Sequence, residues 1–175
     1  MPEIVTLVDA DGSPTGSAER SVVRRDNLRH AATAVLVRDP EGRIYVHRRS
    51  PTKDWAPGHH DAAAGGVLTA GEDPEESARR ELEEELAVSG ADLRPLGLNH
   101  YEDDTTRVVE HVYETTWDGP VVWADGEVVW GAWLTLDELA VRLADPGWSF
   151  VPDTRALLAR LAADRVGDYA RLSAR

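Results

Sequence analysis

The alternation of apolar and polar positions in the first fifty residues predicts strands joined by tight turns. Residues 4–20 read as a strand, a turn at Asp11-Gly12 and a return strand. Residues 31–37 and 43–49 read as a second pair of strands around another turn. The chain is therefore expected to open with β-structure, including an N-terminal β-hairpin.

The pattern changes to a helical one after a glycine-containing loop. Asp73 and Pro74 form a strong helix start, with aspartate as the N-cap and proline at the first helical position, and the helix should run to about Leu86 or Ala87. The remaining segments read as strands in 93–101, 107–117 and 128–134, a helix opened by a capping box at Thr135–Glu138, and a last helix starting near Asp153 and carrying leucines 157, 158 and 161. This order predicts a mixed α/β sandwich in a single domain, residues 1–175.

Composition narrows the class of protein and of partner. The net charge of −13 argues against binding of nucleic acid or of an anionic membrane, because the summed field repels polyanions. No cysteine is present, which excludes disulfides and thiolate zinc sites. An acidic N-terminus unlike a signal peptide, and the lack of any apolar run of about 18 residues, predict a cytoplasmic protein without a membrane span. A small anionic substrate would need local basic residues or metal cations.

The octet RRELEEEL, residues 79–86, concentrates charge on the first predicted helix. At 100° per residue, Glu81, Glu84 and Glu85 fall within an arc of roughly 100°. The apolar stripe beside this arc consists of Ala78, Leu82 and Leu86. Because that stripe must face the sheet, the three carboxylates lie at the edge of the buried face.

Two interpretations of these glutamates compete. A solvated acidic stripe, paired with Arg79 and Arg80, is the usual one for a glutamate-rich helix, and it suits Glu76 and Glu83. Like charges at this spacing repel, so a helix gains nothing structurally from clustering the other three. A hard divalent cation reverses that argument, since Mg²⁺ binds carboxylate oxygens and keeps coordination sites for substrate phosphates.

The surrounding residues, GGVLTAGEDPEESARRELEEELAV, resemble the Nudix box. The pattern falls on Gly66, Glu72, Arg80, Glu81, Leu82, Glu84, Glu85 and Val88. The departure is Ala87, where the family usually has glycine, a mild change at a helix end that does not touch the chemistry. The chain from about residue 4 to 145 is also similar to the Nudix branch related to isopentenyl-diphosphate isomerase and its bacterial hydrolases.

The resemblance implies the Nudix fold, an α/β/α sandwich with a mixed β-sheet and an N-terminal β-hairpin. It also implies a pyrophosphohydrolase that cleaves a nucleoside diphosphate or its derivative by water attack, with Mg²⁺ (or Mn²⁺) as cofactor. By position, Glu81, Glu84, Glu85 and the Gly65 carbonyl would be the metal ligands. Arg80, together with Glu72, would orient these glutamates.

Residues outside the box complete the expected site. An acidic ligand or base precedes the late strand in many such enzymes, which indicates Glu127 ahead of Asp125, and Glu110 or Glu114 less strongly. Arg49 and Lys53 are candidates for binding substrate phosphates. Trp55 is a candidate for stacking on a base, whereas core packing is expected for most of the three tryptophans Trp123, Trp130 and Trp133.

The histidines bear on the competing functions. His30, His59 and His60 could bind a transition metal as in the isomerase branch, although a backbone contact near the sheet is the structural alternative for His30. The isomerase acid is missing, since Ala63 and Ala64 occupy its stretch and Gly66 replaces a histidine ligand. An isopentenyl-diphosphate isomerase is therefore disfavoured. A non-catalytic nucleotide-sensing module would have no need for all three glutamates. A scaffold that binds partners through its acidic surface would explain the net charge but not the spacing of the box. The sequence does not decide whether the protein forms a homodimer.

Overall fold

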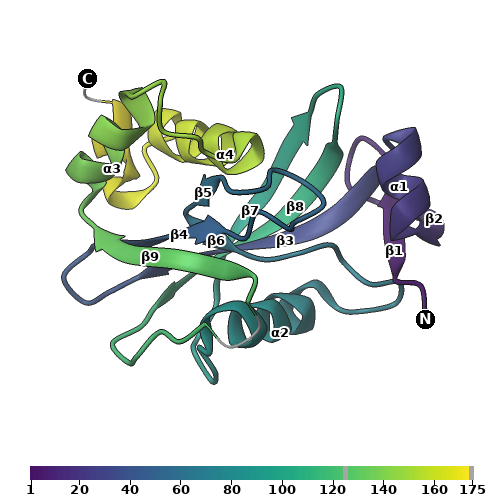
Figure 1. The fold of residues 1–175 in the computed structure, drawn as a ribbon, viewed down its shortest axis with the longest axis horizontal. Helices are drawn as coiled ribbons and strands as arrows, with labels where there is room; N and C mark the ends of the chain where they lie inside the picture. The colour runs from purple at the N-terminus through teal and green to yellow at the C-terminus, as the bar shows by residue number, and fades with distance from the viewer. Residues whose placement is uncertain (124–125, 174–175) are drawn as a thin grey trace.

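A computed structural model, which describes residues 1–123 and 126–173, places a mixed β-sheet between helices (Figure 1). Helix α2 (Pro74–Leu86) covers one face of the sheet, and helices α3 (Leu136–Ala144) and α4 (Pro152–Ala163) cover the other. The predicted α/β/α sandwich is confirmed. In the described ranges, no helix combines the length and the apolar character needed to cross a bilayer.

The N-terminal hairpin is confirmed, and a helix that the sequence pattern did not reveal follows it. Strands β1 (Ile4–Val8) and β2 (Pro14–Glu19) pair antiparallel. Helix α1 (Arg20–Asp26) begins at the next residue and buries only Val23. A seven-residue helix with one buried side chain has too few turns to show an apolar period. Helix α1 places two arginines, Arg20 and Arg24, at the rim of the site.

The long ladder of the sheet is parallel. Strand β3 (Arg29–Arg38) pairs in parallel with β8 (Arg107–Thr116) along its whole length, and β7 (Arg94–Glu102) pairs antiparallel with β8. Strand β3 is buried at nearly every position, as expected for a central strand covered on both faces. Because β3 and β8 are far apart in the sequence, their pairing could not be read from local signals.

The second predicted strand pair, residues 31–37 and 43–49, forms antiparallel contacts only next to its turn. Within the described residues, β3 meets β4 (Ile44–Arg49) at Arg38 and Ile44, and the body of β4 pairs instead with β9 (Val128–Leu134). The short strands β5 (His60–Asp61) and β6 (Ala63–Ala64) continue the sheet between the diverging strands, β5 on β4 and β6 on β3. This split in the sheet creates the space that the site occupies.

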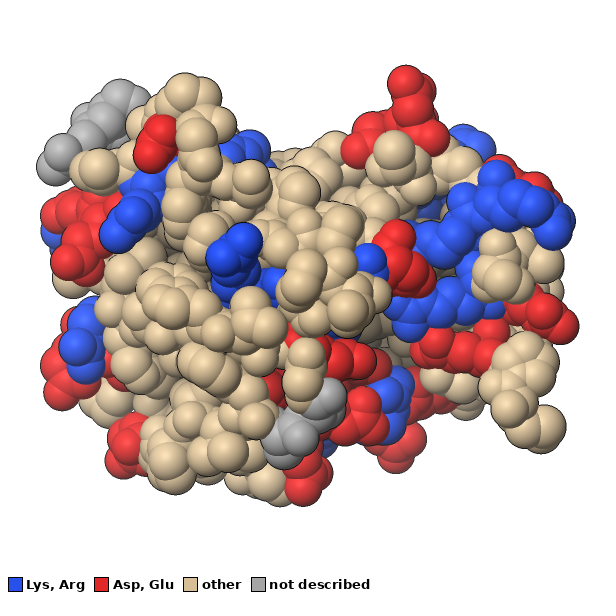
Figure 2. Space-filling view, in the orientation of Figure 1, with Lys and Arg blue, Asp and Glu red and all other residues tan. Residues whose placement is uncertain are grey.

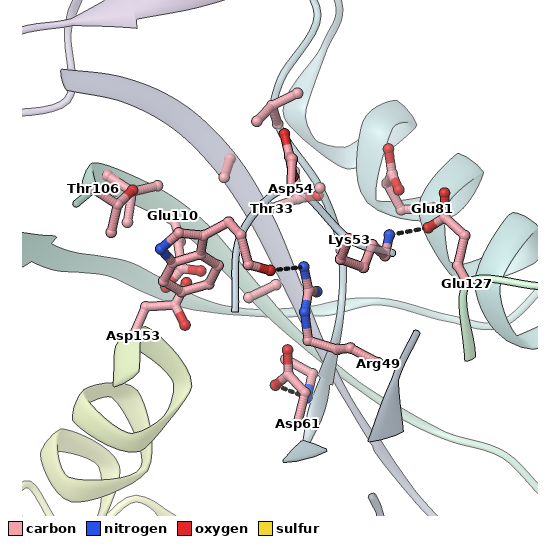
Figure 3. A pocket seen from close by; sticks show the side chains of 18 of the residues that line it. Thr33, Arg49, Lys53, Asp54, Asp61, Glu81, Thr106, Glu110, Glu127 and Asp153 are labelled. Atoms are coloured by element: carbon pink, nitrogen blue, oxygen red, sulfur yellow. Dashed lines mark hydrogen bonds and ion pairs between the residues drawn. The ribbon is translucent and has the colours of Figure 1, made fainter. Parts of the chain in front are cut away.

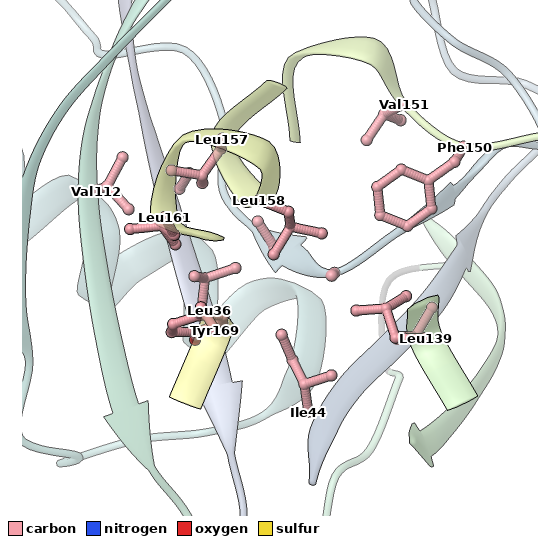
Figure 4. Close-up of a cluster of buried hydrophobic side chains, with 14 of the residues drawn as sticks. Leu36, Ile44, Val112, Leu139, Phe150, Val151, Leu157, Leu158, Leu161 and Tyr169 are labelled. Atoms are coloured by element: carbon pink, nitrogen blue, oxygen red, sulfur yellow. The ribbon is translucent and has the colours of Figure 1, made fainter. Parts of the chain in front are cut away.

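Two apolar clusters hold the layers together. The larger one contains the predicted leucines of α4, packed on Leu36 and Ile44, together with Tyr169 from the short helix η1 (Gly167–Ser173) (Figure 4). The other contains the predicted stripe of α2, Ala78, Leu82 and Leu86, packed on Val35 and Val37. Burying a leucine stabilises the fold by about 1.5–3 kcal/mol. The stripe therefore fixes the rotation of α2 about its axis, and with it the direction of the glutamates.

The expectation of core packing for the late tryptophans was wrong for Trp123 and Trp130. Both side chains are exposed, and the Trp123 indole nitrogen donates a hydrogen bond to the Tyr45 hydroxyl at 2.9 Å. Trp133 is partly buried against the cluster under α2, and its ring lies edge-on to Tyr45. Strand β9 pairs with β4, and Val129 next to Trp130 is also an exposed apolar side chain of this strand.

The ends of α2 follow the sequence signals. The Asp73 carboxylate accepts hydrogen bonds from the backbone amides of Glu75 and Glu76 at 2.9 and 3.2 Å, as an N-cap should. At the other end, Ala87 has a φ of +54°, in the left-handed region that favours glycine. The residue at which the box departs from its usual glycine is thus the C-cap of the glutamate helix.

Candidate active site

A cavity of about 600 Å³ lies between α1, α2 and the split in the sheet. On the face shown in Figure 2, basic side chains gather over α1, and acidic and basic side chains alternate toward α2. The cavity brings together most of the predicted site residues: Arg49, Lys53, Trp55, Gly65, Gly66, Arg80, Glu81, Glu84 and Glu127. Arg20 and Arg24 of α1 also line it, a contribution that the sequence pattern did not indicate.

The three glutamates of the predicted arc differ in exposure. The exposed fractions of the side chains are 13% for Glu81, 54% for Glu84 and 4% for Glu85. Burial raises the pKa of Glu85 to about 8 and also raises the pKa of Glu81. A buried carboxylate is costly unless a cation compensates its charge. The inner part of the arc is therefore built to accept positive charge.

Arg80 ties the glutamates of the box together. Its guanidinium donates two hydrogen bonds to the Glu72 carboxylate, at 2.9 and 3.1 Å, and one to Glu81 at 2.7 Å. A longer contact of 3.4 Å reaches Glu84. The hydrogen bonds from Arg80 hold the pKa of Glu72 below its ordinary value. These contacts suit the orienting role expected for Arg80 with Glu72.

Two glycines let the backbone approach the glutamates. A Cβ at Gly65 would lie 1.9 Å from the Thr33 carbonyl oxygen of β3. A Cβ at Gly66 would lie 2.7 Å from the carboxyl carbon of Glu81. Both distances are shorter than any real Cβ contact, so a side chain at either position would displace a neighbour. Glycine at Gly66 keeps the Glu81 carboxylate close to the backbone, as the box requires.

Lys53 and Glu127 meet at the edge of the cavity beside α2. The Lys53 ammonium donates a hydrogen bond to the Glu127 carboxylate (Figure 3). It also lies 3.8 Å from an oxygen of Glu85. The Glu127 carbonyl accepts a hydrogen bond from the Ser50 amide at 2.7 Å, which joins the two loops. Asp125, the second acid proposed for this loop, lies outside the described residues. Glu114 pairs with Arg94 on the far part of the sheet.

Arg49 and Trp55 form the centre of the cavity. The Arg49 guanidinium donates to the Trp55 carbonyl at 2.9 Å, and its central carbon lies 5.9 Å from the Trp55 ring centroid. The Trp55 indole nitrogen donates to the Thr105 hydroxyl at 3.4 Å. The two predicted substrate-binding side chains therefore lie against each other, with Arg49 between the glutamate helix and the inner end of the cavity (Figure 3).

The inner end contains an acidic cluster that the sequence analysis did not assemble. Asp61, Glu110 and Asp153 are all buried and come from β5, β8 and the start of α4. Burial raises the pKa of all three, and repulsion by Asp153 adds to the rise at Asp61, whose pKa reaches about 7, and at Glu110. Glu110 was a weak candidate, Asp153 only marked the start of the last predicted helix, and Asp61 had no assigned role. Only the packing of three distant segments unites them.

The histidines make backbone contacts. The Nδ1 atoms of His30, His59 and His60 lie 3.0 Å from the carbonyls of Leu28, Pro57 and Ser149 respectively. His30 is buried, which lowers its pKa to about 4. His60 also stacks on Trp148, with ring centroids 4.5 Å apart. The structural alternative for His30 therefore accounts for its position.

The donor set at α2 fits a divalent cation. Glu81 and Glu84 line the cavity together with Gly65, and the buried Glu85 lies on the same helix, 3.8 Å from the cavity-lining Lys53. Oxygen donors are the ligands that Mg²⁺ prefers. Within residues 1–123 and 126–173, no three acidic or histidine side chains converge closely enough to hold a metal as they stand. Arg80 pairs with Glu81 and Glu84, and Lys53 pairs with Glu85 and Glu127, so basic side chains occupy the places next to these carboxylates.

Fold and site together define a class of protein, an α/β/α enzyme whose carboxylate-bearing helix faces a polar cavity. Comparison with known proteins assigns the family. The model of the NUDIX domain matches residues 28–154. The Nudix hydrolase orf19 of Rhodococcus erythropolis is 44% identical over 167 residues, covering 90% of each chain. The Nudix hydrolase YfcD of Escherichia coli K12 is 39% identical over 157 residues, covering 90% of this chain and 85% of that one.

Solved structures agree with this assignment. The crystal structure of DR0079 from Deinococcus radiodurans has a TM-score of 0.75 and 30% identity, and the match covers 90% of this chain and 98% of that one. A MutT protein from Methanosarcina mazei, with a TM-score of 0.66 and 19% identity over 79% of this chain and 96% of its own, shows the same fold. The chain belongs to the NUDIX domain family. It is a hydrolase that acts on diphosphate bonds, in a family that generally uses divalent cations and small nucleotide-derived substrates.

Proposed function

We propose that the protein is a Mg²⁺-dependent pyrophosphohydrolase that cleaves a nucleoside diphosphate or nucleoside-diphosphate derivative by attack of water. The main support is one cavity that holds both the carboxylates of α2 and the basic side chains Arg49 and Lys53. Its volume of about 600 Å³ lies in the range typical of small-ligand sites. Carboxylates alone would repel a diphosphate, whereas this combination can bind one through a bridging cation.

The residues take the following roles in this proposal. Glu81, Glu84, Glu85 and the Gly65 carbonyl hold Mg²⁺, with Mn²⁺ as an alternative. When bound, the cation neutralises phosphate charge and polarises the attacking water. Arg80, anchored by Glu72, keeps the glutamates in place, and Glu127 accepts a proton from the water or adds an oxygen ligand.

Substrate binding is assigned to the basic and aromatic side chains of the cavity. Arg49 and Lys53 supply positive charge to the phosphates, and Trp55 offers an aromatic face on which a base can stack. Arg49 lies between the glutamate helix and the inner end of the cavity, which is where a diphosphate would have to lie if the rest of the substrate extended inward (Figure 3). The net charge of −13 then does not prevent binding of an anionic substrate, because the basic side chains Arg49 and Lys53 face its phosphates.

The test is a substrate screen with Mg²⁺ across nucleoside diphosphates, nucleotide sugars and dinucleoside polyphosphates. Release of phosphate or of a monophosphate is expected, and Glu84→Gln should abolish it. Glu83→Gln is the matched control, because Glu83 is an exposed residue of the same helix outside the arc. Tight nucleotide binding without turnover would support a sensor instead. Turnover of isopentenyl diphosphate would contradict the argument from Ala63 and Ala64.

A further inference from the structure

Lys53 is the single lysine of the chain. Eighteen of the nineteen basic side chains are arginines, so every other positive side chain, on the surface and in the cavity, is a guanidinium. Arginine and lysine differ where geometry matters. Arginine presents a rigid fork that suits a fixed, two-pronged pairing with a carboxylate, and lysine presents a compact point charge on a flexible four-carbon stem. The position of the one ammonium is therefore informative.

The Lys53 ammonium lies among carboxylates that the proposed function gives to the metal. It donates a hydrogen bond to Glu127 and lies 3.8 Å from Glu85, and its own side chain is only 17% exposed. Figure 3 shows the Lys53 side chain pointing toward Glu127, close to the helix that carries Glu81. An ammonium here supplies the positive charge that a carboxylate as buried as Glu85 requires.

The two cations that contact Glu81, Glu84 or Glu85, Arg80 and Lys53, are held very differently. Arg80 makes a two-pronged pairing with Glu72 and further contacts with Glu81 and Glu84, so four hydrogen bonds to carboxylates fix it. Among the residues that the structure describes, the Lys53 ammonium has one hydrogen bond, to Glu127, and one longer ion pair, with Glu85. Separating Lys53 from its carboxylate partners therefore costs less free energy than separating Arg80 from its partners. Of the two, Lys53 is the one that a dication can displace.

We propose that Lys53 and the divalent cation are alternative partners of Glu85 and Glu127, and that cation binding transfers the Lys53 ammonium to the substrate phosphates. The inference rests on the proposed function, because it takes the metal ligands from it. Displacement of Lys53 lets the carboxylates approach one another around the dication. The released ammonium stays within the reach of its flexible stem, in a cavity whose ligand is anionic.

This exchange couples two binding events through one side chain. Cation binding frees a positive group for the phosphates, and phosphate binding removes a competitor of the cation. By linkage, each ligand then raises the affinity for the other by the same factor. Lysine suits this role because it can change partners, whereas an arginine fork would stay paired with the glutamates.

The first test measures the reactivity of Lys53 by acylation with acetic anhydride, followed by mass spectrometry. With one lysine in the chain, the only other amine is the N-terminus, which serves as an internal control. Saturating Mn²⁺ should raise the acylation rate of Lys53 at least fivefold, and adding inorganic pyrophosphate with Mn²⁺ should lower it again. The rate at the N-terminus should not change. An unchanged or slower Lys53 rate with Mn²⁺ would overturn the exchange.

The second test measures Mn²⁺ affinity by calorimetry without substrate. Lys53→Met should bind Mn²⁺ about tenfold more tightly, because the competing cation is gone, and Lys53→Arg should bind it no more tightly than the unmodified protein. Arg79→Met is the control for loss of one positive charge, since Arg79 lies on α2 but pairs with Glu75. If Mn²⁺ binds equally to Lys53→Met and to the unmodified protein, the exchange is wrong and the hydrolase proposal stands. If no divalent cation binds, the hydrolase proposal itself fails.

Discussion

Replacing Asp61 by asparagine should make the protein more stable at neutral and alkaline pH. The Asp61 side chain is buried, and one of its oxygens accepts hydrogen bonds from the Ala63 amide at 3.0 Å and the Thr154 hydroxyl at 2.7 Å. An asparagine oxygen can accept both bonds. The substitution therefore removes the buried charge and leaves the hydrogen bonds of that oxygen in place.

The size of the effect follows from the pKa of Asp61. Burial and the neighbouring Asp153 raise this pKa from 3.8 to about 7. Because the folded-state value is above the unfolded one, the folded protein keeps a proton that the unfolded chain has released. Stability is then lost as pH rises from about 4 to about 7. One pKa unit corresponds to about 1.4 kcal/mol, so the loss through this group reaches up to about 4 kcal/mol.

The assay is urea unfolding of both proteins across this pH range. Asp61→Asn and the unmodified protein should have similar unfolding free energies near about pH 4, and the variant should gain up to about 4 kcal/mol by about pH 8. Asp104→Asn, in the exposed turn between β7 and β8, controls for the loss of one negative charge and should show a flat difference. A flat difference for Asp61→Asn, or a variant less stable at pH 8, would refute the reasoning.

Two further predictions concern the ends of the box. Gly66→Ala should displace the Glu81 carboxylate and weaken Mn²⁺ binding measured by calorimetry, with a small effect on the melting temperature, because the clashing group ends a flexible side chain. Gly65→Ala clashes with the backbone of β3 and should instead destabilise the fold. Ala87→Gly should raise the unfolding free energy by about 1 kcal/mol, since Ala87 has the left-handed φ that penalises a Cβ; a decrease would show that glycine's flexibility outweighs the relieved strain.

The glutamate helix could be predicted almost completely because its signals are local. The Asp73 cap, the apolar stripe and the arc of carboxylates all lie within a few turns of one helix, and the structure reproduces its bounds. The contacts of Arg80 with Glu72 and Glu81 followed from the box. Local order of this kind depends on residues three, four and seven positions apart, which a single sequence displays directly.

The split of the sheet and the acidic cluster could not be predicted for the opposite reason. Strand β4 prefers β9, more than eighty residues away, over its neighbour β3, and no periodicity encodes that choice. Asp61, Glu110 and Asp153 lie in three segments, each with an ordinary local interpretation. They become one group of interacting carboxyls only when β5, β8 and α4 pack together, and their shared burial then sets their pKa values.

The spacing of the box fixes the directions of Glu81, Glu84 and Glu85, but burial decides what each carboxylate can do. Glu84 is largely solvated, so it can lose a partner at little cost, while Glu85 is so buried that its pKa reaches about 8. A cation near Glu85 therefore does more than balance charge, because it determines whether that carboxyl is ionised at all. Lys53 lies where it supplies such a charge, and in the proposed exchange this single lysine connects the ionisation of the helix with binding of the anionic substrate.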